Sequence, residues 1–321
     1  MPTTSSVQLP DFLALTRVFS LRTNRHCYTV TAASEQAWLV SELLSDDERS
    51  ALKSLKTGLW AAVCFPTCDA SQLRLAMDFM TALLLHSSRM RCGKDYELFE
   101  HVFPKVVASM PTDLSRQTLS VLCDEFKAAQ ERLLVYRHSN TLPNLDDYIA
   151  LRRNASGIPM LLSLVEMVEG LKTIPNNVNL KRLAADLISL SLDVFAYNNE
   201  QQAGNQLNLI AVIQAEKGVS VQGAINLAFT HIERTLREFR MLVDPASFEG
   251  SSTSAWDWLR PRKTPPSSPI VDGDTQLFIR GLEDCIVGTL NWSYDTELFF
   301  GTKGDEVRQY GWVFLRDSNS A

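Results

Sequence analysis

The sequence is short of several residue types, and each shortage excludes a class of protein. Glycine is scarce, with 14 of 321 residues, and the alternation of apolar and polar residues that marks strands is rare. No run approaches the ~18 consecutive apolar residues of a membrane-spanning helix. Basic residues do not exceed acidic ones, since 31 against 37 gives a net charge of −6. A nucleic-acid-binding protein usually needs a basic excess or stripe, so that class is excluded.

Cysteine and histidine are also few and scattered. Cys64 and Cys68 have no second Cys or His pair nearby to complete a zinc site, and none of the five histidines forms a His-x-x-x-His pair. The start of the chain, Met1 to Leu15, lacks the basic and then apolar order of a signal peptide. We therefore expect free thiols in a soluble, cytoplasmic protein with no membrane span.

Apolar residues recur at three- and four-residue spacing over long segments, which is typical of amphipathic or buried helices. The pattern predicts helices over Ala37–Leu55, Asp69–Met90, Leu114–Arg137, Leu145–Leu171, Leu180–Ala215, Val221–Val243 and Thr275–Phe300. Asp69 is placed to cap the helix that follows it. The pattern indicates an all-α fold with a single domain over residues 1–321.

Two segments do not resemble packed core. Residues 1–10 are polar, and residues from about 246 to 275 contain a Gly-Ser-Ser-Thr-Ser stretch followed by several prolines. We expect both segments to be flexible. In the second, Trp256, Trp258 and Leu259 provide apolar side chains that could dock on the core, so a disordered loop and a lid both stay open.

Several stretches together resemble one family. They are Phe65-Pro66 followed by Asp78-Phe79-Met80, Tyr148 to Asn154 with Gly157 and Leu164-Val165-Glu166, Leu192 to Gln201, and Gly288 to Gly301. Their order and spacing resemble the class I terpene synthases, in particular fungal and bacterial sesquiterpene cyclases. The resemblance implies the isoprenoid synthase fold, a helical barrel around an apolar cavity. It also implies a cluster of three magnesium ions and basic side chains that hold the diphosphate of a prenyl substrate.

The metal-binding positions of that family are changed in this chain. The aspartate-rich motif corresponds to residues 87–91, which read Ser-Ser-Arg-Met-Arg, and arginine cannot bind a metal cation. The second metal motif corresponds to Leu192, Ala196 and Glu200, of which one could be a ligand. The family's Arg-Tyr pair is Leu298-Phe299 here. We therefore expect no metal ion, and weak or absent magnesium-driven ionisation of a prenyl diphosphate.

The candidate site residues form three groups. The candidate acid or base groups are Glu200, Asp193, Tyr197 and His86. Arg152, Arg153, Arg89 and Arg91 are candidates for holding pyrophosphate, although the first two could instead pair with Glu166 or another helix. The residues expected to line the pocket are Phe79, Leu83, Ser87, Leu192, Phe195, Ala196, Trp292, Leu298 and Phe299. Ordinary core packing is the alternative for the hydrophobic ones among them.

Three functions stay open. The first is an atypical terpene-cyclase-like enzyme of fungal secondary metabolism that acts on a sesquiterpene-type substrate without the magnesium cluster. It would rearrange a preformed terpenoid or couple it, for example to an amine through a C–N bond as in an alkaloid. The second is a cyclase that acts on farnesyl diphosphate with a rearranged Mg²⁺ site. The third is a non-catalytic relative that binds a terpenoid or a protein partner. A homodimer is compatible with each.

Overall fold

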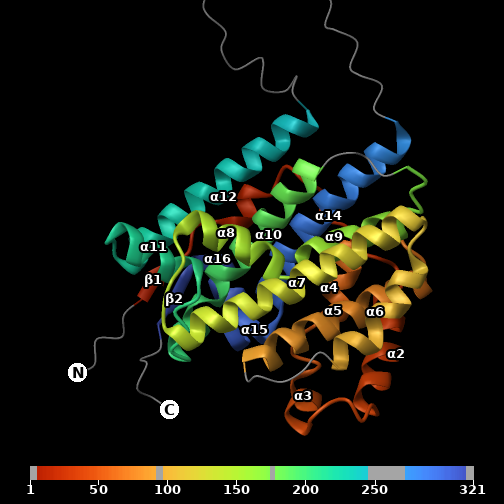
Figure 1. The fold of residues 1–321 in the computed structure, drawn as a ribbon, viewed down its shortest axis with the longest axis horizontal. Coiled ribbons are helices and arrows are strands. Elements are labelled where there is room, and N and C mark those ends of the chain that lie inside the picture. Colours follow the sequence, from red (N-terminus) through yellow and green to blue (C-terminus); the bar gives the residue numbers. More distant parts are fainter. Residues whose placement is uncertain (1–5, 92–96, 174–177, 245–271, 316–321) are drawn as a thin grey trace, which may run out of the picture.

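The computed structural model describes residues 6–91, 97–173, 178–244 and 272–315, and these parts of the chain are mainly helical (Figure 1). The first helices are α1 (Phe12–Leu15), α2 (Cys27–Leu39), α3 (Asp46–Ala51), α4 (Thr57–Cys64), α5 (Ala70–Arg91), α6 (Glu97–Ser109), α7 (Asp113–Ser139) and α8 (Leu145–Ala155). They are followed by α9 (Ile158–Val168), α10 (Val178–Gln202), α11 (Leu209–Lys217), α12 (Val221–Val243), α14 (Gly273–Asp295), α15 (Glu297–Phe300) and α16 (Gly304–Tyr310). The predicted all-α fold is confirmed.

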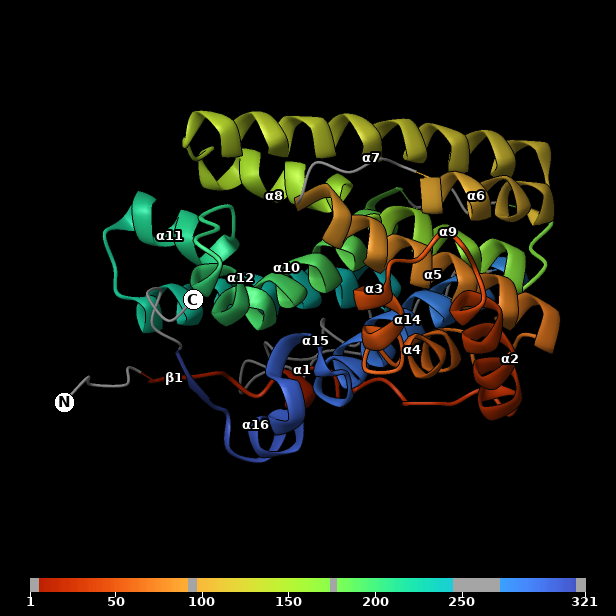
Figure 2. The ribbon, with the colours of Figure 1, turned by 90° about the horizontal axis from the view of Figure 1, so that it is seen from below.

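Helix α10 occupies the middle of the molecule. It packs against α8, α9, α12 and α14, and Figure 2 shows it between α7 and α8 on one side and α14 and α15 on the other. Nearly all of its side chains from Leu183 to Val194 are buried. A helix that is buried almost all round belongs to the core of a large domain. Residues placed on α10 are therefore surrounded by several other helices.

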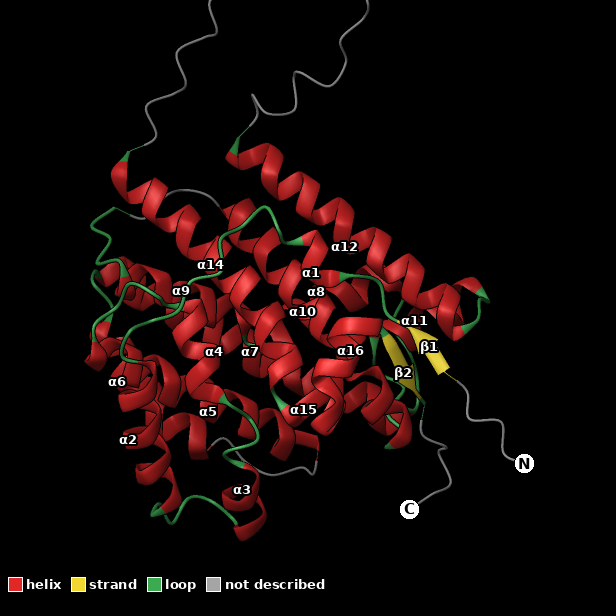
Figure 3. Ribbon diagram, turned by 180° about the vertical axis from the view of Figure 1, so that it is seen from behind, coloured by secondary structure: helices red, strands yellow, loops and turns green. Residues whose placement is uncertain are grey.

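A short β-ribbon joins the two ends of the described chain (Figure 3). Strand β1 (Ser6–Gln8) pairs antiparallel with β2 (Trp312–Phe314), and Val7 faces Val313. The expectation that residues 1–10 are flexible is wrong for residues 6–10. The reason is burial: Val7 and Leu9 are both in the core, and the Leu9 N–H donates to Gly311 O at 2.7 Å. Residues 1–5 lie outside the described residues.

The second segment expected to be flexible is described at its end. Residues 272–275 start α14, because Asp272 caps this helix and accepts a hydrogen bond from Thr275 N at 2.7 Å. Residues 272–275 therefore form the cap and first turn of α14 rather than part of a flexible segment. Residues 246–271, with Trp256, Trp258 and Leu259, lie outside the described residues.

Several predicted helices have the expected bounds, and others are divided. Helices α5, α7 and α12 agree closely with the prediction, and Asp69 Oδ1 accepts hydrogen bonds from the N–H groups at the start of α5. The segment Leu145–Leu171 is divided into α8 and α9 at Gly157, where φ is +71°. The segment Leu180–Ala215 is divided into α10 and α11 by residues 203–208. In the described helices, none has both the length and the apolar character of a membrane span.

Candidate functional site

The carboxylate of Asp193 is the centre of a buried polar network on α10. Arg152 Nε lies 2.6 Å from its Oδ1 atom. The hydroxyl of Tyr148 and the backbone N–H of Leu209, at 3.1 Å, both donate to its Oδ2 atom. Burial, followed by the charge of Asp193, raises the pKa of Tyr148, so this phenol stays a hydrogen-bond donor. The carboxylate is thus held by one cation and two donors.

Asn208, in the loop between α10 and α11, bridges Asp193 and Glu200, which both lie on α10. Asn208 Nδ2 donates to Asp193 O at 2.8 Å and to Glu200 Oε2 at 2.7 Å. The backbone N–H of Asn205 donates to Glu200 O at 2.8 Å. Asn208 also caps α11, since its Oδ1 atom accepts a hydrogen bond from Ile210 N at 2.8 Å. One asparagine therefore fixes both the start of α11 and the position of the Glu200 carboxylate.

Both candidate pyrophosphate-binding arginines of α8 form ion pairs with α10. Arg152 keeps its charge: although burial lowers its pKa, the charges of Asp193 and Glu200 raise the pKa overall. Arg153 binds Asp186 through two hydrogen bonds, at 2.6 and 3.0 Å. The expected alternative partner, Glu166, is instead bound by Lys181 at 2.5 Å and by Ser115 at 2.7 Å. A role of Arg152 and Arg153 in binding pyrophosphate stays a prediction.

Residues 87–91 at the end of α5, which were predicted to stand in place of the aspartate-rich motif, also contact a neighbouring helix. Arg89 makes two hydrogen bonds to Glu48 of α3, at 2.6 and 2.7 Å, and this guanidinium lowers the pKa of Glu48 to about 2. Ser87 Oγ donates to Leu83 O at 2.9 Å. Arg91 is the last residue of α5, and its side chain is outside the described part. The motif thus ties α5 to α3.

The remaining acid and base candidates have other neighbours. His86 is fully buried, with its ring centroid 5.4 Å from that of Phe126 and 6.1 Å from that of Phe99. The Tyr197 hydroxyl lies 3.4 Å from Gln214 Oε1 on α11, and burial raises its pKa. Of the four candidates, the structure joins Asp193 and Glu200 through one shared partner.

The site lies in a region that matches a known family. Residues 66–238 match the family described as terpene synthase family 2, C-terminal metal binding. The chain belongs to the terpene synthase family. This confirms the predicted class I family and identifies a terpene synthase-like enzyme of the lyase type.

Curated relatives and solved structures agree with this assignment. Sesquiterpene synthase Agr1 of Cyclocybe aegerita is 28% identical over 334 residues, which cover 94% of this chain and 90% of the relative. Sesquiterpene synthase 1 of Postia placenta is 27% identical, with 96% and 95% covered. The crystal structure of a-eudesmol synthase has a TM-score of 0.66 at 18% identity, over 86% of this chain and 96% of that one. This last likeness is one of fold.

In this terpene synthase, the aromatic residues expected to line the pocket pack against other aromatic side chains. The ring of Phe195 lies 4.8 Å from Phe12, 5.3 Å from Tyr294 and 6.1 Å from Phe299, measured between centroids. Trp292 stacks on Trp60 at 4.4 Å. Phe79 and Leu83 are also buried. Core packing accounts for these contacts, and the role of the residues in lining a substrate pocket stays a prediction.

The apolar residues predicted to stand at the family's motif positions lie on two neighbouring helices. Asn199 Nδ2 donates to Leu298 O at 2.8 Å and to Phe299 O at 3.2 Å, which joins α15 to the end of α10. Leu192 and Ala196, on α10, are half-buried against the same core. The residues predicted to replace polar family residues therefore lie on helices that adjoin each other.

In the part of the chain that the structure describes, the side chains that could bind a metal ion are dispersed. In the described ranges, no three His, Cys, Asp or Glu residues are grouped so that they could hold a metal ion. Asp78, which precedes the changed motif, accepts hydrogen bonds from Ser34, Trp38 and Arg74. Its carboxylate is used in joining α2 to α5.

Sequence reasoning missed the partners that complete the Asp193 network. Tyr148 belongs to a stretch that carries the family resemblance but is not among the predicted site residues, and the apolar spacing places Asn208 inside one long helix. The signal for Asn208 was present, because Gly204 and two asparagines favour a turn, and asparagine is a preferred residue just before a helix.

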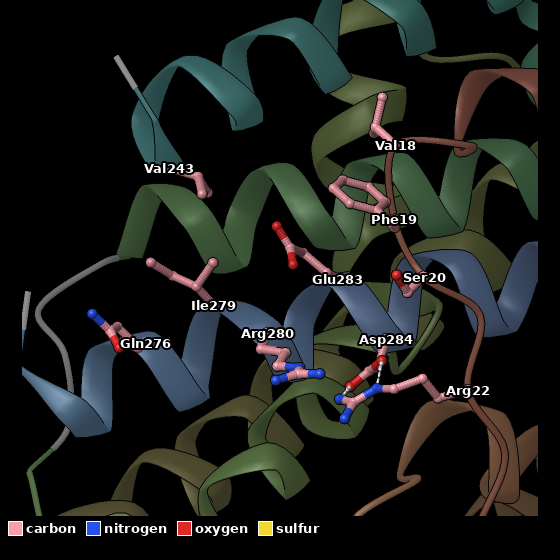
Figure 4. A pocket seen from close by; sticks show the side chains of 10 residues that line it. All are labelled: Val18, Phe19, Ser20, Arg22, Val243, Gln276, Ile279, Arg280, Glu283 and Asp284. Carbon is pink, nitrogen blue, oxygen red and sulfur yellow. Dashed lines mark hydrogen bonds and ion pairs between the residues drawn. The ribbon is translucent and has the colours of Figure 1, made fainter. Parts of the chain in front are cut away.

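A separate hollow opens at the start of α14, with a volume of about 480 Å³ (Figure 4). Arg22 and Asp284 form an ion pair in it, and Glu283 and Arg280 project from the same helix. Burial raises the pKa of Asp284 in spite of the nearby Arg22. None of the candidate site residues lines this hollow.

Proposed function

We propose that this chain is an atypical terpene synthase that acts on an isoprenoid without the three-magnesium ionisation of a prenyl diphosphate. The observation that carries the proposal is the Arg152–Asp193 ion pair. Arg152 lies in the stretch where the resemblance places the family's diphosphate-binding arginine. Its charge is neutralised by Asp193, which adjoins the second metal motif. The relatives that are similar in sequence are sesquiterpene synthases, which supports a substrate of sesquiterpene size.

The residues at the metal positions do not fit a magnesium cluster. Magnesium takes octahedral oxygen ligands and is usually held by carboxylates. Leu192 and Ala196 offer none, and Ser87 offers a neutral hydroxyl that donates to its own helix. Using Asp193 as a ligand would separate it from Arg152, and breaking this ion pair, in which Arg152 is 23% exposed, costs about 2–3 kcal/mol. Glu200 is then the one acidic ligand left at the three positions of the second motif.

The proposed chemistry uses proton transfer in an apolar, dehydrated site. Glu200 is the group proposed to act as acid and base, with its carboxylate held by Asn208. In the coupling version, Glu200 in its protonated form adds a proton to a carbon–carbon double bond of the terpenoid. An amine nitrogen bonds to the resulting cationic carbon, and the ammonium proton returns to Glu200. Without an amine, the cation rearranges and loses a proton to Glu200.

A second candidate is a cyclase that acts on farnesyl diphosphate with a rearranged Mg²⁺ site. The retention of Glu200 favours it, together with the names of the relatives, which are sesquiterpene synthases. The two candidates differ in whether pyrophosphate leaves the substrate.

The test is to incubate the protein with farnesyl diphosphate and Mg²⁺ and to measure released pyrophosphate. We expect release at the background of a protein-free control, while a magnesium-dependent relative assayed in parallel releases it. Release at the rate of that relative would overturn the proposal.

The role of Glu200 is tested by product formation from a preformed terpenoid. We expect Glu200→Gln to abolish product at an unchanged unfolding temperature, and Glu125→Gln, an exposed position on α7, to leave product unchanged. Equal product from the wild type and Glu200→Gln would remove Glu200 from the mechanism.

A further inference from the structure

A buried hydroxyl on α10 has no hydrogen-bond partner among the described residues. Ser189 is fully buried, and its Oγ atom makes no hydrogen bond to any of them. Its neighbour Ser191 is equally buried but donates to Leu187 O at 2.6 Å. Thr289 shows the usual behaviour too, since it accepts a hydrogen bond from Trp60. Buried polar atoms are nearly always bonded, so an exception calls for an explanation.

The position of Ser189 on its helix points to that explanation. Residues three or four apart share a helix face, so Ser189 lies on the same face as Leu192, Ala196 and Glu200. These three correspond to the second metal motif of the family. Ser189 is about 16 Å of helix rise from Glu200, and therefore lies deeper in the molecule along this face.

A second unpartnered donor lies in the loop that follows α10. Asn205 Nδ2 is buried with no hydrogen bond to any residue of the described ranges. The rest of Asn205 is fixed, because its N–H donates to Glu200 O and its Oδ1 atom accepts from Leu207 N at 3.1 Å. The hydroxyl of Ser189 can donate as well as accept, whereas an amide nitrogen donates only. Oxygen acceptors would satisfy both groups.

We infer that Ser189 and Asn205 bind oxygen atoms of the substrate, which is therefore an oxygenated isoprenoid, an alcohol or a carbonyl compound, rather than a hydrocarbon. This inference rests on the proposed function and narrows its substrate class. A site that contains buried hydrogen-bonding groups rejects analogues that lack the matching group, because those groups then stay unpaired. Ser189 is thus a specificity-determining residue for a preformed terpenoid.

The test compares Ser189→Ala with the matched variant Ser191→Ala, using farnesol and the hydrocarbon farnesene as probes. We expect the wild type to bind farnesol more tightly than farnesene. Ser189→Ala should reduce this preference about 3- to 10-fold and keep or raise the unfolding temperature. Ser191→Ala should lower the unfolding temperature and keep the preference, because it removes a hydrogen bond that is already made.

Three results would overturn the inference: no preference in the wild type, an unchanged preference in Ser189→Ala, or a loss of stability in Ser189→Ala equal to that in Ser191→Ala. The last would mean that Ser189 is bonded inside the folded protein. Pyrophosphate release from farnesyl diphosphate is measured separately. Release would refute the proposed function, whereas the probe affinities decide the role of Ser189.

Discussion

The substitution Asp193→Asn tests whether Arg152 is neutralised within the protein. Asparagine has a similar shape and keeps an oxygen for Tyr148 and the Leu209 N–H, but it removes the charge beside Arg152. Breaking a buried ion pair costs about 3–5 kcal/mol. The Arg152 side chain is 23% exposed, so water recovers part of that loss. We expect the free energy of unfolding to fall by about 2–3 kcal/mol.

The same substitution should create an anion site. Two unit charges 4 Å apart interact with about 4 kcal/mol at an effective dielectric constant near 20, and desolvation of the anion offsets part of this. We therefore expect Asp193→Asn to bind inorganic pyrophosphate about 10- to 100-fold more tightly than the wild type, without magnesium and at low salt.

Isothermal titration calorimetry with pyrophosphate measures this effect. Asp295→Asn is the control: it removes one negative charge from a partly exposed pair with Arg308, and we expect no change in affinity. If the wild type already binds pyrophosphate as tightly as Asp193→Asn, Arg152 is available to anions and the reasoning is refuted.

Two further predictions concern stability. Glu48→Gln should lower the free energy of unfolding at neutral pH by up to about 3 kcal/mol, because pairing with Arg89 lowers the pKa of Glu48 from 4.5 to about 2. That contribution is present above pH 4.5 and is lost as the pH falls towards 2. In urea unfolding, the difference in free energy of unfolding between Glu48→Gln and the wild type should therefore shrink as the pH falls. A difference that does not depend on pH would exclude the Glu48–Arg89 pair as its source. Gly157→Ala should lower the free energy of unfolding by more than the ~1 kcal/mol expected for Gly218→Ala. Both glycines have positive φ, but a Cβ at Gly157 would also lie 2.4 Å from Leu83 Cδ1. Equal losses by thermal unfolding would show that Leu83 moves aside freely.

Local sequence signals predicted the helices whose ends they mark. Helix α12 has the predicted bounds Val221–Val243, and Asp69 caps α5 as expected. The segment Ala37–Leu55 failed because its apolar residues belong to two helices: α2 ends at Leu39, and Ser45 with Glu48 forms a capping box that starts α3. A capping box is visible in the sequence, and here it predicts the start of a helix that the apolar spacing does not predict.

The partners of the site residues could not be predicted in the same way. The sequence predicts both Arg152 and Asp193 as site residues, but nothing local to either position tells which acid pairs with which arginine. Glu166 was an equally reasonable partner for Arg152 or Arg153 until the packing of α8 on α10 placed Asp186 and Asp193 beside them. Ion pairs between distant segments depend on how helices pack, which one sequence does not specify.

In the proposed function, helices α5 and α10 do not bind divalent cations between them. The most direct measurement is a crystal grown with Mn²⁺ and pyrophosphate, with anomalous diffraction recorded to locate manganese. We expect no anomalous peak between the end of α5 and Glu200. Three manganese ions bridging these helices and the pyrophosphate would contradict it.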